Sequence, residues 1–471
     1  MLSSESPRNR ISISGDDPMI PFLINLSDTV ANNRWAAEFY RPGFSFEPID
    51  PSKWCKIRQI TSDKQYGMSL VMNQEGRGIP IYRLNEIDNC FLSEIPEKCA
   101  DVSRREAAPF FMKDGDILFC RTNGNINYVG RTGIWYGSEE MVFASYLVKV
   151  RTKQNELTPE YLTVYLNTAF GRRQIVRRAM PSNQVNVSAS ELMKIDVYVP
   201  DVDIQKEITG LVRKAYKVRK SALLAYSSAQ ALLSSYLKEG ELKFDHPLSY
   251  SVKFSDVMRE GRTDADYFQV PYMQVQKHLD RLESVPLASL VDFVKGVEVG
   301  SNAYADSGKL FMRVSNLTER GIKSNASDKL IPEKLYQSLA GAFCPKQGEL
   351  LLTKDGTPGV CWVVDRGCEC IISSAIVRLL PKNDNVPPEY LALAINSTLC
   401  QMQIEQQASG ALILHWKLPL IKKLRIPLCD KDTMKEIARL VKESKKQQYK
   451  SESLLASAKS MVEELIESAV K

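Results

Sequence analysis

The chain has 471 residues, of which 44% are hydrophobic and 25% charged, and its formal net charge is +6. These values are ordinary for a globular protein with room for two cores, and so small a positive charge says little about a nucleic-acid partner. No apolar run approaches the roughly 20 residues of a membrane span, and the N-terminal stretch lacks the pattern of a signal peptide. We therefore expect a cytoplasmic protein.

The cysteines and histidines are too widely spaced for a zinc site. The ten cysteines are scattered, and only three histidines are present, His246, His278 and His415. Structural zinc sites need closely spaced pairs of these residues. We therefore expect no metal, and thiols that are reduced and mostly buried.

In chain order, residues 1–33 form a polar N-terminal arm and residues 34–200 a first domain. The domain opens with an aromatic-rich segment, Arg34–Pro48, that we expect in the core. A helix is predicted over Thr158–Arg178, with Thr158 as its cap and Pro159 at its first position. Short strands separated by turn residues are predicted at Ile79–Arg83, Asp116–Cys120 and Met141–Val150.

Two long helices are predicted, a central spacer helix over residues 201–240 and a C-terminal one over 431–471. Apolar residues alternate at steps of four and three, as in a coiled-coil seam, and about 35 residues at 1.5 Å each make a rod of roughly 50 Å. The polar Ser444, Gln447 and Ser451 predict looser pairing in the middle of the second helix. The seam residues are Ile204, Ile208, Leu211, Val218 and Leu232, with Ile437, Leu440, Leu454, Met461 and Leu465.

The second half of the chain repeats the first. Pro159-Glu-Tyr-Leu162 returns 229 residues later as Pro388-Glu-Tyr-Leu391. The second domain, residues 241–430, repeats the order of strands and then a helix from about Pro387. Its predicted strands are Leu310–Val314, Glu349–Thr353 and Ala375–Leu380. The pattern predicts an α+β fold, in which two duplicated domains with irregular, curved sheets are joined by two long antiparallel coiled-coil helices.

Motifs of catalysis are absent from the sequence. It contains no phosphate-binding loop, no Gly-x-Ser-x-Gly elbow and no Asn-Pro-Pro-aromatic run. Asp114-Gly-Asp116 is a poor match to the acidic cluster of a nuclease, and its counterpart, Gln347-Gly-Glu349, keeps only one acid. We expect a turn into a strand at both places, and no enzymatic activity in this chain.

Three kinds of stretch are candidate binding sites. A helix end with four arginines could bind phosphates, or could be a solvated helix end where cations suit the helix dipole. The amide-rich loop Pro181–Val187 matches base edges, although such turns also occur without a ligand. The third stretch places a cation directly after an apolar strand, in Cys120–Tyr128 and again in Thr353–Gly359. The candidate residues are Arg121, Asn123, Asn125, Asn127, Arg173, Arg177, Ser182, Asn183, Gln184, Asn186, Lys354, Asp355, Thr357, His415 and Lys417.

The duplicated order of these motifs resembles the specificity subunits of type I restriction–modification systems. The motifs are Gly115–Arg121, Pro159–Leu162, Pro181–Asn186 and Ile195–Pro200, and then Gly348–Lys354, Pro388–Leu391 and Leu424–Pro427. The resemblance implies two target-recognition domains that each read one half of a split DNA site, with the long helices as a spacer between them.

The same resemblance implies partners rather than cofactors for this chain. They are two adenine-N6 methyltransferase subunits, which use S-adenosylmethionine, often joined by ATP-driven restriction subunits. A protein of a different class stays open at this point, namely a scaffold or phage-defence adaptor whose duplicated domains bind protein. Salt-dependent DNA affinity would separate the two, because phosphate contacts weaken steeply with salt.

Overall fold

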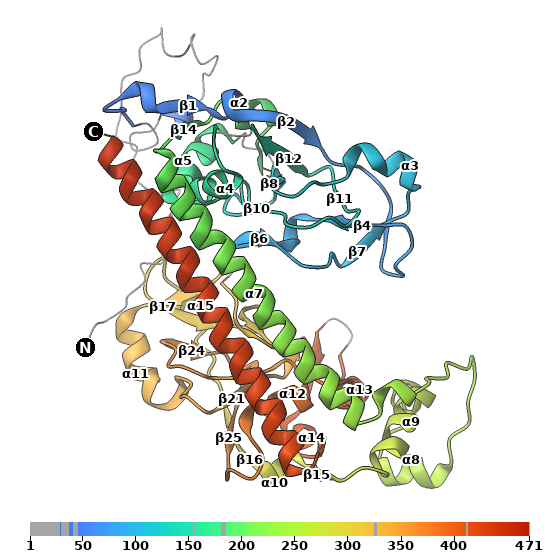
Figure 1. Ribbon diagram of the computed structural model, residues 1–471. Coiled ribbons are helices and arrows are strands. Elements are labelled where there is room, and N and C mark those ends of the chain that lie inside the picture. The colour runs from blue at the N-terminus through green and yellow to red at the C-terminus, as the bar shows by residue number, and fades with distance from the viewer. Residues whose placement is uncertain are drawn as a thin grey trace. The chain divides into compact units, whose positions relative to one another are not determined.

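The computed structural model describes residues 29, 37–40, 46–153, 156–179, 185–324, 327–410 and 413–470. Most of the predicted N-terminal arm therefore lies outside the described residues. The chain divides into two compact units. Unit 1 comprises Met1–Val218 and Lys450–Lys471, and unit 2 comprises Arg219–Tyr449. Each unit contains part of the long helices α7 (Val202–Tyr236) and α15 (Lys431–Ala469), which run side by side (Figure 1).

Unit 1 contains two main sheets of short strands. The six-stranded sheet has the order β2-β12-β8-β10-β6-β5, and the four-stranded sheet the order β11-β4-β7-β3. Two further pairs are β1-β14 and β13-β9. The strands are β1 (Trp54–Lys56), β2 (Thr61–Tyr66), β3 (Met72–Asn73), β4 (Ile79–Tyr82), β5 (Ile87–Asp88), β6 (Cys90–Leu92), β7 (Lys98–Ala100), β8 (Ile117–Cys120), β9 (Thr122–Asn123), β10 (Thr132–Ile134), β11 (Val142–Phe143), β12 (Leu147–Thr152), β13 (Val185–Asn186) and β14 (Asp196–Tyr198).

Unit 2 repeats this order with smaller sheets. Its sheets are β16-β25-β21-β23 and β20-β17-β24, and its strand pairs are β15-β27, β18-β19 and β22-β26. The strands are β15 (Ser284–Pro286), β16 (Val291–Lys295), β17 (Lys309–Met312), β18 (Leu317–Thr318), β19 (Gly321–Ile322), β20 (Lys329–Ile331), β21 (Leu350–Thr353), β22 (Asp355–Gly356), β23 (Cys361–Val363), β24 (Cys370–Ile372), β25 (Ile376–Pro381), β26 (Leu414–His415) and β27 (Arg425–Pro427).

The remaining helices are short. Unit 1 has α2 (Ile57–Ile60), α3 (Arg104–Ala107), α4 (Pro159–Asn167), α5 (Ala169–Arg178) and α6 (Ala189–Leu192). Unit 2 has α8 (Phe254–Glu260), α9 (Val270–Leu279), α10 (Leu287–Leu290), α11 (Glu333–Phe343), α12 (Pro388–Ile395), α13 (Thr398–Gln407) and α14 (Leu418–Ile421). The α+β class expected from the sequence is confirmed. No helix within the described ranges is long and apolar enough to cross a membrane.

The helix predicted over Thr158–Arg178 is in fact two helices, α4 and α5. Thr168 ends α4 and caps α5, where its Oγ1 accepts a hydrogen bond from the Gly171 backbone N–H at 3.3 Å. Gly171 allows the tight turn, because a Cβ there would lie 2.2 Å from the Tyr165 carbonyl oxygen. Ser397 caps α13 in the same way in unit 2. A capping hydroxyl that competes with the helical backbone explains the break that apolar spacing alone did not predict.

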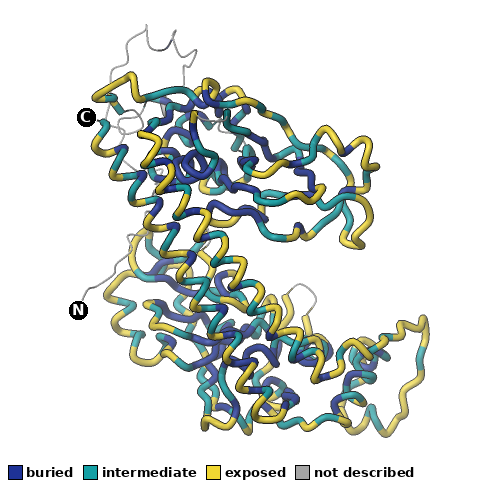
Figure 2. Tube along the Cα trace, viewed as in Figure 1, coloured by how far each residue is buried: buried dark blue, intermediate teal, exposed yellow. Residues whose placement is uncertain are grey.

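The two long helices contribute their apolar faces to the cores of both units. Figure 2 shows exposed and less exposed positions alternating along the two long helices. In unit 1, Ile208, Val212 and Ala215 of α7 are buried with Leu455 and Val462 of α15. The predicted seam residues Leu211, Leu454 and Met461 are only partly buried beside them, as are Ile204 and Leu465. Ile208 is thus buried as predicted, whereas at the other position of the repeat the buried residue is Val212 instead of Leu211, because each helix also packs against the globular part of its unit.

In unit 2 the same displacement is found. Leu233 and Val441 are buried, whereas the predicted Leu232 and Leu440 are partly buried and Ile437 is fully buried. Val218, the last residue of α7 in unit 1, is also a predicted seam residue and is partly buried.

The polar middle of α15 is tightly held, and the expectation of looser pairing there is wrong. The hydroxyl of Ser451 donates to the Ala215 carbonyl at 2.8 Å in unit 1, and the hydroxyl of Ser444 donates to the Ala222 carbonyl at 2.7 Å in unit 2. Both serines are buried. Small residues on both helices let the backbones approach closely enough for these bonds.

The repeat extends from sequence to individual contacts. In unit 1, Glu160 pairs with Arg213 of α7 at 2.6 Å. In unit 2, Glu389 pairs with Lys442 of α15 at 3.5 Å, and both partners are 229 residues further along. The same acid on the same helix of each unit therefore ties the globular part to a long helix.

Candidate nucleic-acid interface

In unit 1 the two predicted loops are brought together by a small strand pair. β8 ends at Cys120, and the next residues form β9, which pairs antiparallel with β13. Asn123 lies opposite Val185, and Thr122 lies opposite Asn186. The Val187 backbone N–H also donates to the Arg121 carbonyl at 2.8 Å. The loop after the strand and the end of the amide-rich loop thus form one surface.

Arg121 is the central side chain of this surface. Its Nε donates to the Asn186 side-chain oxygen at 3.4 Å and its Nη1 to the Ser145 carbonyl at 3.5 Å. The guanidinium carbon lies 4.9 Å from the centroid of the Tyr66 ring, and Tyr66 is 43% exposed. Tyr66, which sequence reasoning missed because it is distant in the chain, holds the cation over an exposed aromatic face.

The asparagines after Arg121 shape the loop with their own side chains. The Asn123 side-chain oxygen accepts from the Asn125 backbone N–H at 2.9 Å, and that of Asn125 accepts from the Asn127 N–H at 2.9 Å. Asn127 is exposed. This bonding holds the loop through the side-chain oxygens. Ser182, Asn183 and Gln184 lie outside the described residues.

In unit 2 the equivalent strand pair, β22-β26, presents different groups. Asp355 lies opposite His415, and its carboxylate contacts both the Lys354 ammonium and the His415 Nδ1, the latter at 2.8 Å. Thr357 and Lys417 are exposed on either side. The Trp416 backbone N–H donates to the Lys354 carbonyl at 2.8 Å, as Val187 does to Arg121. The frame is the same, and the polar side chains differ.

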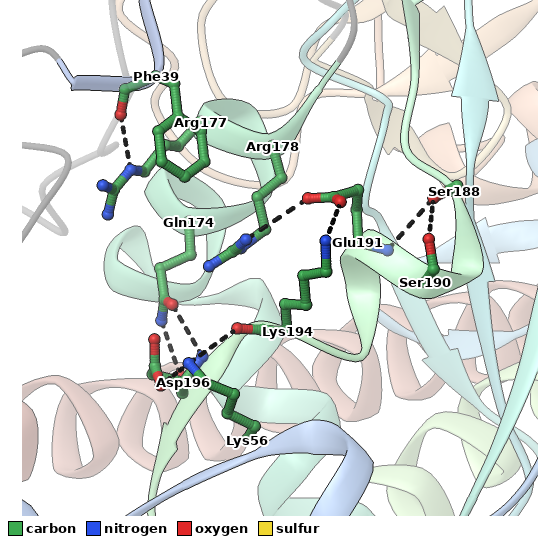
Figure 3. A network of polar contacts seen from close by, with 10 residues as sticks. All are labelled: Phe39, Lys56, Gln174, Arg177, Arg178, Ser188, Ser190, Glu191, Lys194 and Asp196. Atoms are coloured by element: carbon green, nitrogen blue, oxygen red, sulfur yellow. Dashed lines mark hydrogen bonds and ion pairs between the residues drawn. The ribbon is translucent and has the colours of Figure 1, made fainter. Parts of the chain in front are cut away.

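The predicted arginine cluster of α5 is mostly engaged within the fold (Figure 3). The Arg177 Nε donates to the Phe39 carbonyl at 2.6 Å, and its guanidinium lies over the Phe39 ring at 4.1 Å. Burial and the neighbouring Arg178 lower the pKa of Arg177. Arg178 is buried against Glu191, whose carboxylate oxygen lies 3.5 Å away. Of the two arginines of α5 that were predicted to contact DNA, Arg177 is engaged within the fold and Arg173 is exposed.

Arg172 of the same helix is also used internally. Its guanidinium donates to the carbonyls of Val129, Ile126 and Asn127, and so ties α5 to the loop that follows Arg121. Burial lowers its pKa to about 10. In unit 2, Gln401 makes the matching contact to the Gly359 carbonyl at 3.0 Å. These partners were not evident from local sequence because they lie more than forty residues away.

The acids that were weighed as a nuclease site form buried ion pairs instead. Asp116 pairs with Arg151 at 2.6 Å, and Glu349 pairs with Arg378 at 2.6 Å. Both acids directly precede a strand, β8 or β21, as expected for a turn into a strand. No group of three or more metal-binding side chains is gathered in the described part of the chain, and all ten cysteines are free thiols.

No family model matches the chain. Over 176 residues it is 24% identical to the Type I restriction enzyme EcoKI specificity subunit of Escherichia coli (strain K12), a match that covers 36% of this chain and 38% of the relative. The matched part of the chain thus covers well under half the length of that curated relative.

Three solved structures are also similar. They are the type I S subunit from M. genitalium (10% identity, 89% of this chain and 96% of that chain, TM-score 0.40), a structure described for complex assembly of the type I R-M system (12%, 87% and 96%, 0.29) and the HsdS subunit from Thermoanaerobacter tengcongensis (12%, 87% and 95%, 0.28). The resemblance to type I restriction–modification specificity subunits that the repeated motifs indicate is confirmed by the curated relative.

Proposed function

We propose that the chain is the DNA-recognition subunit of a type I restriction–modification complex, in which each unit contacts one half of a bipartite DNA site. The observation that supports this most directly is the equivalence of β9-β13 and β22-β26. The two strand pairs occupy the same place in the repeat, yet one presents Arg121 and Asn186 and the other Asp355 and His415. A common frame with different hydrogen-bonding groups suits two half-sites of different sequence.

The side chains at these strand pairs have the chemistry of base recognition. Arginine pairs well with guanine, asparagine with adenine, and a carboxylate accepts from the amino group of cytosine. In unit 1, Asn186 and Tyr66 orient Arg121 from two sides. In unit 2, Asp355 is flanked by Lys354 and His415, so its negative charge is balanced when it faces the polyanion. Exposed Asn127, Arg173, Thr357 and Lys417 extend the proposed contacts.

The long helices are proposed to fix the gap between the half-sites. Two half-sites one helical turn apart lie about 34 Å from each other, and 35 residues of helix span roughly 50 Å. The proposed partners are two adenine-N6 methyltransferase subunits that use S-adenosylmethionine, with ATP-driven restriction subunits where the complex also cleaves. The chain itself is proposed to be non-catalytic. A support for this is that Asp116 and Glu349, the acids that directly precede β8 and β21, are engaged in ion pairs.

A genome-wide map of N6-methyladenine tests the proposal in cells with and without the gene. The expected result is that deletion removes one split motif, with two defined halves and an undefined gap of constant length. An unchanged map in cells where the chain and its methyltransferase partners are expressed would reject the proposal.

A further inference from the structure

An open hollow of about 440 Å³ lies in unit 1 beside the candidate interface. It is formed by α2, by the start of β2 and by α6 with the residues that follow it. Figure 3 shows two of the lining residues, Ser190 and Lys194, and the ion pair of Lys194 with Glu191. The lining residues are Arg58, Thr61, Ser62, Asp63, Lys64, Ser190, Met193 and Lys194.

The lining of the hollow has an excess of positive charge. Arg58 and Lys64 are exposed, and neither has an acidic partner among the residues that the structure describes. The acid of the lining, Asp63, is already paired with Lys149 at 3.2 Å and with Arg151 at 3.6 Å. Its negative charge is therefore balanced by groups that do not line the hollow, and the two cations remain available to an anion.

The hollow is continuous with the surface around Arg121. Ser62, Lys64 and Tyr66 are the exposed residues of β2, so they share one face of the strand. Tyr66 carries Arg121 over its ring, and its hydroxyl accepts from the Ala189 backbone N–H at 2.9 Å. Lys64 precedes Tyr66 by two residues, about 7 Å along the strand, which equals two base-pair steps of 3.4 Å.

In unit 2, cations from other sequence positions lie beside the residues equivalent to Arg58 and Lys64. The register of the repeat puts Ala288 in the place of Arg58 and Phe293 in the place of Lys64. The Lys382 ammonium nevertheless donates to the Ala288 carbonyl at 2.8 Å, and the Lys422 ammonium lies 5.7 Å from the centroid of the Phe293 ring. A cation is thus present at both places and is supplied by different residues, although Lys382 also lies 3.6 Å from the Asp292 carboxylate.

We define the basic corner as Arg58 and Lys64 in unit 1 and as Lys382 and Lys422 in unit 2. We propose that it binds phosphodiester groups of the DNA backbone beside the base-contacting loops. Binding of a phosphate requires a cation at the right position, and different residues can supply it. Recognition of a base requires a particular side chain. The corner therefore contributes affinity and register without sequence preference. This inference rests on the proposed function.

The test is the salt dependence of binding to a random-sequence DNA duplex, measured with the full-length chain in complex with its methyltransferase partners. Each phosphate contact contributes about 0.9 to the slope of log affinity against log salt concentration. The variant Arg58→Gln/Lys64→Gln should lower that slope by about 2. The variant Arg58→Lys/Lys64→Arg should keep the wild-type slope, because either cation can pair with a phosphate.

A matched control removes the same charge elsewhere in unit 1. Arg105→Gln/Lys206→Gln affects exposed cations of α3 and α7 and should leave the slope unchanged. An equal fall of the slope in both glutamine variants, or no fall in either, would overturn the proposal of a phosphate-binding corner. If the wild-type complex shows no salt-dependent DNA binding at all, the proposed function itself is wrong, which is a distinguishable result.

Discussion

Units 1 and 2 agree in their buried contacts and differ in their exposed polar ones. Gln174 shows the agreement: its amide nitrogen donates to the Asp196 carbonyl at 2.7 Å, and its oxygen accepts from the Asp196 N–H at 2.9 Å. Gln403, 229 residues later, makes the same two bonds to Arg425, at 2.9 and 3.1 Å. At the exposed strand pairs, by contrast, Asn186 occupies the place of His415.

This difference separates the contacts that hold the frame from those available to a ligand. A glutamine that bonds both the N–H and the carbonyl of one strand residue cannot change without weakening the strand that it holds. Exposed side chains on the loops are free to vary with the ligand. Four additional residues between Arg121 and Gly130, compared with Lys354 to Gly359, give unit 1 the longer loop. The two units therefore share one frame and differ in what they present.

The largest effect is expected from lengthening both long helices together. Seven residues inserted after Val218 in α7 and after Gln447 in α15 keep the apolar faces in phase and add about 10 Å of helix. The original sites should lose methylation, and sites with the same halves and a gap longer by about three base pairs should replace them. Methylation mapping measures the sequence and the gap of the methylated sites.

Insertion into only one helix should abolish methylation, because the Ser444 and Ser451 contacts would lose register. A gap that stays constant after insertion into both helices would contradict the spacer role.

The next effect concerns the buried ion pairs, which differ between the units. Glu349 and Arg378 are both buried, at 10% and 5% side-chain exposure, whereas Arg151 is 27% exposed and also contacts Asp63. Glu349→Ala should therefore cost about 3–5 kcal/mol of unit 2 stability, because it leaves a buried cation without a partner. Asp116→Ala should cost unit 1 less. Hydrogen exchange of peptides from β21 and β8 measures the stability of the two units separately. A larger loss of stability from Asp116→Ala than from Glu349→Ala would contradict this account of the ion pairs.

A third expectation is that removal of Gln174 or of Gln403 costs the two units the same amount of stability. Gln174→Ala and Gln403→Ala should each destabilise their own unit by about 1–3 kcal/mol, because each leaves the backbone N–H of Asp196 or Arg425 without its partner. Thermal unfolding combined with hydrogen exchange of β14 and β27 checks both variants. Substitution by glutamate keeps the shape of the side chain but removes the donor, and should therefore also destabilise. Strongly unequal losses would mean that one of the two glutamines does not hold the frame.

The smallest expected effect compares the cations of the two loops. Arg121→Ala should weaken binding to the first half-site about tenfold, within the range for loss of a base-contacting arginine. Lys354→Ala should weaken the second half-site less, because its ammonium is already paired with Asp355. Titration of duplexes in which one half-site at a time is scrambled measures each effect. Equal losses at both half-sites from either variant would argue against local contacts.

Much of the frame could be predicted from the sequence, because it depends on regular spacing. The repeat, the strands before Arg121 and Lys354, and both long helices followed from apolar periodicity and a constant offset. The break at Thr168 did not, since it depends on a capping hydroxyl within an otherwise helical pattern. The burial of Val212 instead of Leu211 in α7 could not be predicted either, because it depends on the globular part that packs against the helix.

The candidate site was less predictable than the frame. Arg177 looked available for a phosphate, but its carbonyl partner, Phe39, lies 138 residues earlier in the chain. A signal was nevertheless present: Gln406 occupies the equivalent position and bonds the Tyr267 carbonyl, the counterpart of Phe39 at an offset of 228. Comparison of the two halves at such pairs would have shown that this position serves the fold. Tyr66 had no comparable signal, because its role arises only where β2 passes under Arg121.

The most direct test of the central claim is a methylation map of cells that carry Asn186→Ala or His415→Ala. These residues occupy equivalent positions in the two units. The account predicts that Asn186→Ala alters or relaxes only one half of the split motif, that His415→Ala does so only in the other half, and that the gap is constant in both. A change in both halves from either variant would contradict separate reading of the two half-sites by the two units.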